Sequence, residues 1–462
     1  MPSEDPIRLG RKLPLGLALV LLIVLGSIQP SFPFPEQSIP SIAKVSPVFR
    51  FVYFRVRSIP LAMDAPMYRN IYSVTSENHQ EVQLTEDNHS FGPALSPDGT
   101  RIAYIHLKSS GCEACLYPPE YEINLMNADG TQPHPIADID GPMSISWSPD
   151  GKSLAYIRFP GFANPIPSFS PRLSSQIAVN MSPRFDSPLY LLPLDGSSSP
   201  RLLSDRVPGG LKWSPDGKRV AYSCHVKQDP SRSAFHLCLS ETMPNGDSKV
   251  LSEAVPRERY SWSPDGMYLA YFTFSSHAFT LCVIGANGSN PHSLTETKGF
   301  PETPEWSWDG RQIVFSGKES KNTAIFLINA DGSGKTRLTG PKLHASRPFW
   351  SPDGKHIAFT SISHDKPQVY VMNDDGSGAR ELTHDRKIAC WTDAWMEKGN
   401  LLLLQCEKLS SSFNMGITYL NFYTLDAEDP NGRPRPVTTD GAIGISIAPI
   451  GDAKERSPGE SR

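Results

Sequence analysis

Histidine and arginine residues stand at matching distances before copies of a repeated five-residue phrase. His89 and His344 each lie six residues before the first residue of a copy, and Arg259 and Arg347 each lie three residues before one. If the copies are equivalent in the fold, these side chains point toward one rim, where imidazole and guanidinium groups could bind an anionic ligand. They could also hold a metal ion together with the carboxylates of a substrate. Coincidence is the alternative, because twelve histidines among 462 residues produce some aligned pairs.

Three other stretches resemble chemical motifs but fit structural roles better. Residues 444–448 are the one relative of a G-x-S-x-G nucleophile motif, yet they end in Ala and lie too near the C-terminus for partner residues to follow. Residues 332–335 contain a Gly and a Lys without the spacing of a phosphate loop. Residues 374–376 are too short for a calcium loop. We therefore assign no catalytic residue, no metal ligand and no cofactor.

The repeated phrase that spaces these residues is turn chemistry. At residues 350–354 it reads Trp-Ser-Pro-Asp-Gly, and an apolar run follows at 357–359. Pro presets the first central turn position, Asp can bond the backbone two residues on, and Gly accepts a positive φ. The phrase therefore predicts a β-hairpin, with the Trp and the apolar run as strand residues.

The phrase recurs along most of the chain. Copies about 50 residues apart and rich in strand signals predict one four-stranded propeller blade per repeat. In one copy Trp replaces the Pro, and past residue 384 a worn seventh copy keeps only a Trp and a Gly. The six clear copies begin at Leu95, Trp147, Trp213, Trp262, Trp306 and Trp350.

The two ends of the repeat region complement each other. Residues 444–451 supply a first strand without the other three, whereas residues 49–57, 70–74 and 81–85 supply the other three without a first. Joining them would form a composite blade and remove the exposed sheet edges. We predict an all-β fold, a single propeller of eight blades over residues 48–452. Seven blades is the alternative if the N-terminal strands pack elsewhere.

The N-terminal segment predicts export. Residues 1–12 carry three basic residues, and residues 13–28 are almost wholly apolar. This pattern is typical of a cleaved signal peptide or of an uncleaved hydrophobic helix that anchors the chain. The run is short of the roughly 20 residues that span a bilayer, but it has no clear cleavage site, so the anchor is the preferred alternative. Pro-rich residues 29–47 predict an extended spacer, and residues 453–462 a polar tail.

Seven cysteines fit an oxidising compartment. Cys224 and Cys238 fall on consecutive predicted strands, and Cys390 and Cys406 flank a predicted hairpin turn. Either pair could form a cross-strand disulfide. Cys282 reads as a small buried strand residue.

The repeat resembles that of the TolB-type propellers, a WD40-like pattern built on Pro-Asp-Gly. The phrase, the apolar strand, the Asn-Ala-Asp-Gly turn and the closing Leu-Thr carry this resemblance over about residues 49–451. Propellers of prolyl-oligopeptidase-like peptidases and of some bacterial lyases are similar. The resemblance implies an extracytoplasmic propeller of the kind that often binds partner proteins. The chain departs from TolB in its predicted blade number.

Charge, export signals and the absence of a catalytic motif together indicate the class of function. A net charge of −4 argues against a general nucleic-acid binder. We expect a non-enzymatic, monomeric propeller of the cell envelope, anchored by the N-terminal helix or secreted, that binds a protein or envelope component through one face. The alternative is a metal-dependent lyase or hydrolase acting on an anionic saccharide or peptide in the propeller channel. A ligand sensor with the insertion at 160–188 as its lid is a third possibility.

Overall fold

The computed structural model describes most of the chain after residue 47. The described residues are 48–57, 68–109, 120–139, 141–158, 187–196, 199–205, 209–225, 235–243, 246–255, 258–275, 278–319, 321–363, 366–385, 387–396, 400–408, 420–429, 432–438 and 442–449. The chain divides into two units, Met1–Val45 and Ser46–Arg462, and all the described residues belong to the second. The predicted anchor or signal at 13–28, the spacer at 29–47 and all but the last two residues of the 160–188 insertion therefore fall outside the described residues.

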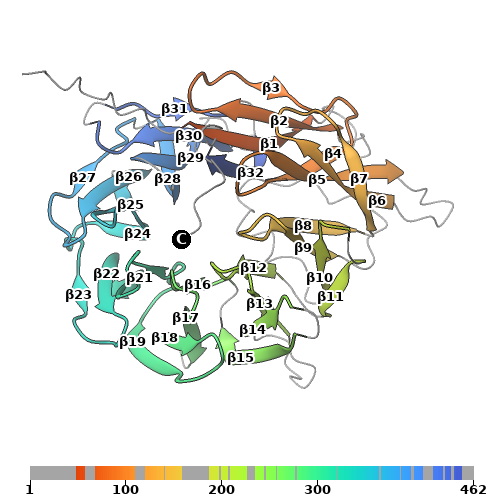
Figure 1. Ribbon diagram of the computed structural model, residues 1–462. Coiled ribbons are helices and arrows are strands. Elements are labelled where there is room, and N and C mark those ends of the chain that lie inside the picture. Colours follow the sequence, from red (N-terminus) through yellow and green to blue (C-terminus); the bar gives the residue numbers. More distant parts are fainter. Residues whose placement is uncertain are drawn as a thin grey trace, which may run out of the picture. The chain divides into compact units, whose positions relative to one another are not determined.

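The described residues form eight four-stranded antiparallel sheets arranged in a ring (Figure 1), so the all-β propeller of eight blades is confirmed. We number the blades in chain order. Blade 1 contains β4 (Ser90–Leu95), β5 (Arg101–Ser109), β6 (Glu120–Asn127) and β7 (His134–Ile139). Blade 2 contains β8 (Pro142–Trp147), β9 (Ser153–Arg158), β10 (Leu189–Pro193) and β11 (Arg201–Ser204). Blade 3 contains β12 (Gly209–Trp213), β13 (Arg219–Cys224), β14 (Phe235–Glu241) and β15 (Ser248–Val255).

The next three blades follow the same order. Blade 4 contains β16 (Tyr260–Trp262), β17 (Tyr268–Ser275), β18 (Ala278–Gly285) and β19 (His292–Thr297). Blade 5 contains β20 (Glu305–Trp306), β21 (Gln312–Glu319), β22 (Asn322–Asn329) and β23 (Thr336–Arg337). Blade 6 contains β24 (His344–Trp350), β25 (His356–Ser363), β26 (Lys366–Asn373) and β27 (Arg380–Glu381). The first strand of each blade is its inner strand, as Figure 1 shows for β12, β16 and β24.

The worn repeat and the two chain ends complete the ring. Blade 7 contains β28 (Ile388–Trp395), β29 (Leu401–Lys408), β30 (Leu420–Asp426) and β31 (Arg435–Pro436). Blade 8 is composite: β32 (Ala442–Pro449) is its inner strand, followed by β1 (Phe49–Arg57), β2 (Tyr68–Thr75) and β3 (Val82–Gln83). The antiparallel register pairs Phe49 with Pro449 and Phe51 with Ile447. The predicted closure is confirmed, although β3 is shorter than the predicted strand at 81–85.

Apolar side chains fill every junction between blades. The middle strands of each blade lie between two neighbouring blades, so their residues are buried on both faces and the sequence reads as a continuous apolar run. In blade 6, for example, residues 357–361 are all buried. The described residues contain eight apolar clusters, and each joins two neighbouring blades, including blades 7 with 8 and 8 with 1. Side-chain packing therefore continues around the whole ring.

The repeated phrase forms the same hydrogen-bonded turn in all six copies. The Ser hydroxyl donates to the Asp carboxylate at 2.6 Å, and the same carboxylate accepts the N–H of the residue two positions on. The Gly residues have φ between 68° and 71°, a region that side chains with a Cβ rarely adopt. The phrase is thus scaffolding, as its chemistry predicts.

The phrase also packs against the next blade. A Cβ on Gly266 would lie 3.3 Å from Pro215 Cδ, so the Pro of one phrase touches the Gly of the next. A Cβ on Gly354 would meet nothing within 4 Å. Blade 5, which precedes it, carries Trp308 in place of the Pro. This one substitution removes a recurring contact and leaves an aromatic side chain at a turn.

Candidate functional site

Because adjacent strands are antiparallel, each blade has turns between its first and second and its third and fourth strands at one end. We call that end of the ring the turn face, and the opposite end the loop face. The loop face carries the connections that enter each inner strand, so the predicted rim residues belong to it. His89 precedes β4 in blade 1 and His344 begins β24 in blade 6. Both side chains are exposed.

The two histidines have different surroundings. The His89 ring lies 6.4 Å, centroid to centroid, from the His106 ring, and its Nδ1 is 2.6 Å from the Asp87 carbonyl oxygen. His344 pairs across the strands with Ile362, which is itself exposed. The histidines therefore occupy corresponding places, but they lie in blades that are not neighbours.

Arg259 lies next to an acidic residue of the following blade. It forms an ion pair with Glu302, which belongs to the connection that enters β20. Both side chains are about one-third exposed, at 30% and 32%. The guanidinium thus joins the loop-face ends of blades 4 and 5.

Arg347 sits in a bulge of β24, where the register shifts between Ser346 and Phe349. Its backbone has a φ of 52°, and its carbonyl accepts a hydrogen bond from Thr392 of blade 7 at 3.0 Å. Burial raises the pKa of the neighbouring Asp393 carboxyl, and the positive charge of Arg347 partly offsets this effect.

Arg259 and Arg347 differ in backbone conformation, because only Arg347 has a positive φ. In blade 4 the positive φ falls on Glu258, one residue earlier relative to the Trp than in blade 6. The strands also differ, since β16 is only three residues long and has no bulge in its register. Equal spacing in the sequence therefore gives unequal backbone positions.

The inner strands of blades 3 and 5 carry a charged pair that sequence reasoning missed. Lys212 directly precedes the Trp of β12, and Glu305 directly precedes the Trp of β20. Lys212 Nζ donates to the Tyr260 carbonyl oxygen of blade 4 at 2.8 Å. Burial lowers the pKa of Lys212, and burial raises the pKa of Glu305 to about 7 while the Lys212 charge opposes that rise. A carboxyl that titrates near neutrality can exchange protons with a ligand.

Exposed aromatic side chains gather on blades 4 and 5. Tyr268, Phe274, Phe300 and Trp308 are the exposed large aromatics of the part of the chain that the structure describes. Phe300 is 85% exposed and extends an aromatic row, with its ring 5.2 Å from that of Phe279, which lies 4.8 Å from Phe274. Tyr268 and Phe274 mark opposite ends of β17, so the aromatic residues reach both faces of the ring.

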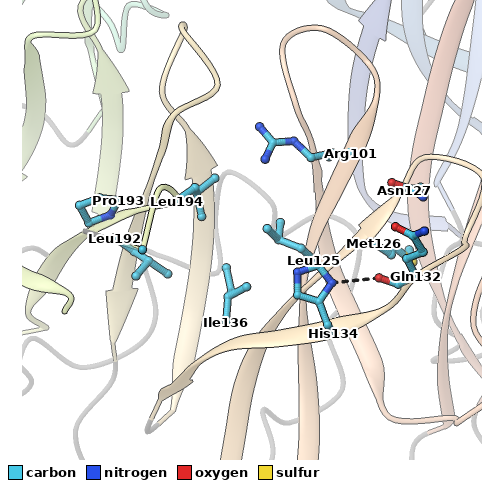
Figure 2. Close-up of a pocket in the computed structure, with 11 residues that line it drawn as sticks. Arg101, Leu125, Met126, Asn127, Gln132, His134, Ile136, Leu192, Pro193 and Leu194 are labelled. Atoms are coloured by element: carbon cyan, nitrogen blue, oxygen red, sulfur yellow. Dashed lines mark hydrogen bonds between the residues drawn. The ribbon is translucent and has the colours of Figure 1, made fainter. Parts of the chain in front are cut away.

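Two grooves lie at corresponding places on the turn face, each between neighbouring blades. The blade 1–2 groove has a volume of about 320 Å³. Figure 2 shows it lined by Arg101 of β5, Leu125 of β6, His134 and Ile136 of β7, and Leu192 near the end of β10. The blade 4–5 groove has a volume of about 640 Å³. Its lining includes Asp265, Tyr268, His292, Trp308, Asp309 and Asp331.

Among the described residues, two pairs of cysteines form disulfides. Cys224 in β13 is joined to Cys238 in β14, and Cys390 in β28 is joined to Cys406 in β29, with Cα atoms 5.9 Å and 4.2 Å apart. Both bonds cross between neighbouring strands of one blade. Cys282 is buried and free.

The described ranges contain neither a metal-binding cluster nor a membrane-spanning helix. Among those residues, no group of three or more His, Cys, Asp or Glu side chains could hold a metal ion. The same residues include no helix with the length and apolar character needed to cross a bilayer.

The repeat matches a known family. Residues 224–425, from the end of β13 into β30, match the family model described as the TolB beta propeller domain. Residues 224–425 belong to a TolB-type β-propeller domain. The predicted resemblance is confirmed, and the motif residues on which it rests are those of the shared turn.

Relatives cover the TolB-type propeller only in part. The Tol-Pal system protein TolB of Coxiella burnetii is 38% identical over 63 residues, which are 13% of this chain and 14% of that protein. TolB of Legionella pneumophila (strain Corby) is 39% identical over 61 residues, 13% of each chain. The chain thus spans a small part of the length of the curated relatives it matches. Dipeptidyl peptidase 4 of Porphyromonas gingivalis has a similar fold, with a TM-score of 0.53, 11% identity, and coverage of 82% of this chain and 59% of that chain.

Proposed function

We propose that this chain is an extracytoplasmic TolB-type propeller that binds a protein or envelope component through the loop face of blades 4 and 5. The observation that carries the proposal is a row of three aromatic side chains, in which exposed Phe274 and exposed Phe300 both lie against buried Phe279; we call it the aromatic row. A phenylalanine that is 85% exposed costs free energy in water, and exposed aromatic patches on soluble proteins commonly mark interaction surfaces.

The charges beside the aromatic row suit a protein partner. Glu302 follows Phe300 by two residues, and its carboxylate pairs with Arg259. An apolar centre bordered by polar groups that are partly exposed is the usual anatomy of a binding interface. Arg259, predicted from its spacing, would belong to the rim of this interface.

Location outside the cytoplasm is part of the proposal. The two disulfides are of the kind found in oxidising compartments. The relatives that match in sequence are Tol-Pal system proteins. The predicted anchor or signal at residues 13–28 would deliver the chain there.

A site-specific cross-link tests the proposal. We would place p-benzoylphenylalanine at position 300 in the tagged full chain, expressed in its own organism, and identify the adduct by mass spectrometry. We expect one defined adduct from position 300 that Phe274→Ser weakens severalfold. The matched control is the same probe at position 82, since Val82 of blade 8 is 52% exposed and lies far along the ring. The same adduct from both positions, or none from position 300, would contradict the proposal.

An enzymatic role is the second candidate, and Glu305 favours it. A lyase or hydrolase acting on an anionic saccharide or peptide needs a proton donor or acceptor that titrates near neutral pH. Glu305 meets this requirement, because burial raises its pKa to about 7. Lys212 would supply a positive charge for the substrate. Turnover of acidic oligosaccharide and peptide libraries, with and without divalent metal ions, tests this role. Activity that Glu305→Gln does not reduce would exclude Glu305 as the proton-transferring group.

A further inference from the structure

An internal arginine occupies the turn-face junction between blades 1 and 2. The Arg101 guanidinium lies 4.9 Å from the centre of the Trp147 ring and donates to the Gly151 carbonyl oxygen at 2.8 Å. Trp147 and Gly151 both belong to the phrase of the next blade. The junction between blades 3 and 4 repeats the hydrogen bond, from Arg219 to the Gly266 carbonyl oxygen at 3.3 Å. A guanidinium is therefore a fitting occupant of this place.

Blade 4 has no such arginine at its junction with blade 5. Arg101 and Arg219 each follow the Asp-Gly of their phrase by two residues, and Tyr268 holds that position in blade 4. Among the described residues, no side chain donates to the Gly310 carbonyl oxygen, the counterpart of those of Gly151 and Gly266. The groove at this junction is twice as large, about 640 Å³ against about 320 Å³.

The walls of the blade 4–5 groove suit a cation with an apolar stem. Trp306 is the counterpart of Trp147, and Tyr268 and Trp308 add exposed aromatic surface at 43% and 52%. Aromatic faces attract guanidinium groups and also pack against the methylene stem of arginine. The blade 1–2 groove, by contrast, is lined mainly by aliphatic side chains (Figure 2).

The charge of the groove is also complementary. Asp265, Asp309 and Asp331 line it, together with His292. Hydrogen bonds from Ser307 and Ser333 lower the pKa of Asp309 and Asp331 respectively, so both carboxylates are ionised at neutral pH. The Arg311 guanidinium lies 3.8 Å from Asp309, but it is 84% exposed and does not line the groove. Among the described residues that line the blade 1–2 groove, none is acidic.

We propose that the blade 4–5 groove binds an arginine side chain on an exposed segment of a partner protein. The guanidinium occupies the place that Arg101 and Arg219 fill elsewhere in the ring, donating to the Gly310 carbonyl oxygen and lying over Trp306. The inference deepens the proposed function, protein binding, and rests on it. It adds a second contact on the turn face, and it names the chemistry of the group that this contact recognises.

Peptide titration of the full chain tests the groove directly. The probe is acetyl-Leu-Arg-Leu-amide, and its control is the same peptide with citrulline, which keeps the shape but removes the charge. Binding is followed by fluorine NMR on chain labelled with 5-fluorotryptophan, with the Trp308 resonance assigned from Trp308→Phe. We expect a saturable shift of that resonance at millimolar peptide, and about tenfold weaker binding of the citrulline peptide because charge-assisted hydrogen bonds are the stronger ones.

Two variants locate the site. Tyr268→Arg restores the internal guanidinium that blades 1 and 3 carry, and it should reduce binding at least tenfold without loss of fold. Trp308→Pro restores the repeated phrase and should weaken peptide binding severalfold. Because this variant lacks the Trp308 resonance, its binding is measured by calorimetry. Arg101→Lys, in the other groove, is the matched control and should bind as the wild type does. If Tyr268→Arg fails to fold, the Trp308→Pro result decides.

Three results would overturn the inference: no saturable shift, equal binding of the citrulline peptide, or unchanged binding by folded Tyr268→Arg. Self-association that Tyr268→Arg abolishes would assign the groove to a second copy of the chain and overturn a foreign partner. The cross-link at position 300 reports separately. A specific adduct there without peptide binding would remove this inference and leave the proposed function standing.

Discussion

Lys212 and Glu305 influence each other's ionisation from the inner strands of blades that are not neighbours. Lys212 reaches across blade 4 by donating to the Tyr260 carbonyl oxygen, which brings its ammonium within range of the Glu305 carboxylate. Glu258 and Arg259 also act on Lys212, so four ionisable residues from three blades are linked. Each of the pair keeps some exposed surface, but the surrounding inner strands remove much of its hydration.

The linked pair predicts a pH dependence of stability. Burial raises the pKa of Glu305 from 4.5 to about 7, so the folded chain binds this proton more tightly than the unfolded chain. The stability that Glu305 contributes is therefore greatest below pH 4.5 and is lost as the pH rises toward 7. In urea unfolding across this range, Glu305→Gln should flatten the decline. An unchanged slope in the variant would show that another group causes it.

Lys212 gives a second test of the same pair. Its positive charge opposes the rise in the pKa of Glu305, so Lys212→Met should raise that pKa further and shift the stability decline to higher pH. NMR titration of the Glu305 side chain in both proteins measures the shift directly. A lower pKa in the variant would contradict the assigned contact.

Ring closure predicts a specific effect of truncation. Removing residues 442–462 takes away β32, exposes the edge of β1, and leaves blade 8 without its inner strand. Exposed edges favour association between chains, so we expect a lower and less cooperative melting transition and a larger size in light scattering. Removing only residues 452–462 is the control and should leave the melting curve unchanged. A truncation at 442 that melts like the full chain would disprove the role of β32.

The fold could be read from the sequence because its signal is repeated. One phrase such as residues 350–354 predicts only a hairpin, but six copies at similar spacing predict blades. The lone first strand at 444–451 and the strands without a first strand that begin at 49–57 predict closure. Turn residues act locally, since Asp353 bonds Ser351 and the backbone beside it. Local chemistry of this kind is visible without knowing the neighbours.

The site could be read only in part, because it depends on contacts between blades. Arg259 lies in the connection that enters β16, but its spacing in the sequence could not show that Glu302 of the next blade pairs with it. Lys212 and Glu305 are far apart in the sequence and have no motif, so only the fold joins them. For the blade 4–5 groove, the signal in the sequence is Trp308, which replaces the Pro of the repeated phrase.

The cross-strand disulfides predict a measurable gain in stability. They close short loops, with sequence separations of 14 and 16 residues. Cross-links of this length contribute about 3 kcal/mol each on the chain-entropy account. Non-reducing peptide mapping should recover a 224–238 and a 390–406 linkage, and the double variant Cys390→Ser/Cys406→Ser should unfold at lower denaturant. Cys282→Ala, at a buried free cysteine, is the control. Fully free thiols in protein purified without reductant would contradict both bonds.

Substitutions at Gly354 and Gly266 distinguish the cost of backbone strain from the cost of lost packing in the repeated turn. Its φ is 71°, and a Cβ there would meet nothing within 4 Å because blade 5 carries Trp308 where the other phrases carry Pro. Gly354→Val should therefore lower the free energy of unfolding only by the cost of a left-handed backbone, about 1–2 kcal/mol. Gly266→Val should lose more, since Pro215 Cδ would lie 3.3 Å from the new Cβ. Urea unfolding of the two variants, with Gly354→Asn as a milder replacement, checks the order. Equal losses at both positions would mean that the contact between the phrase of one blade and the Pro of the blade before it carries no energy.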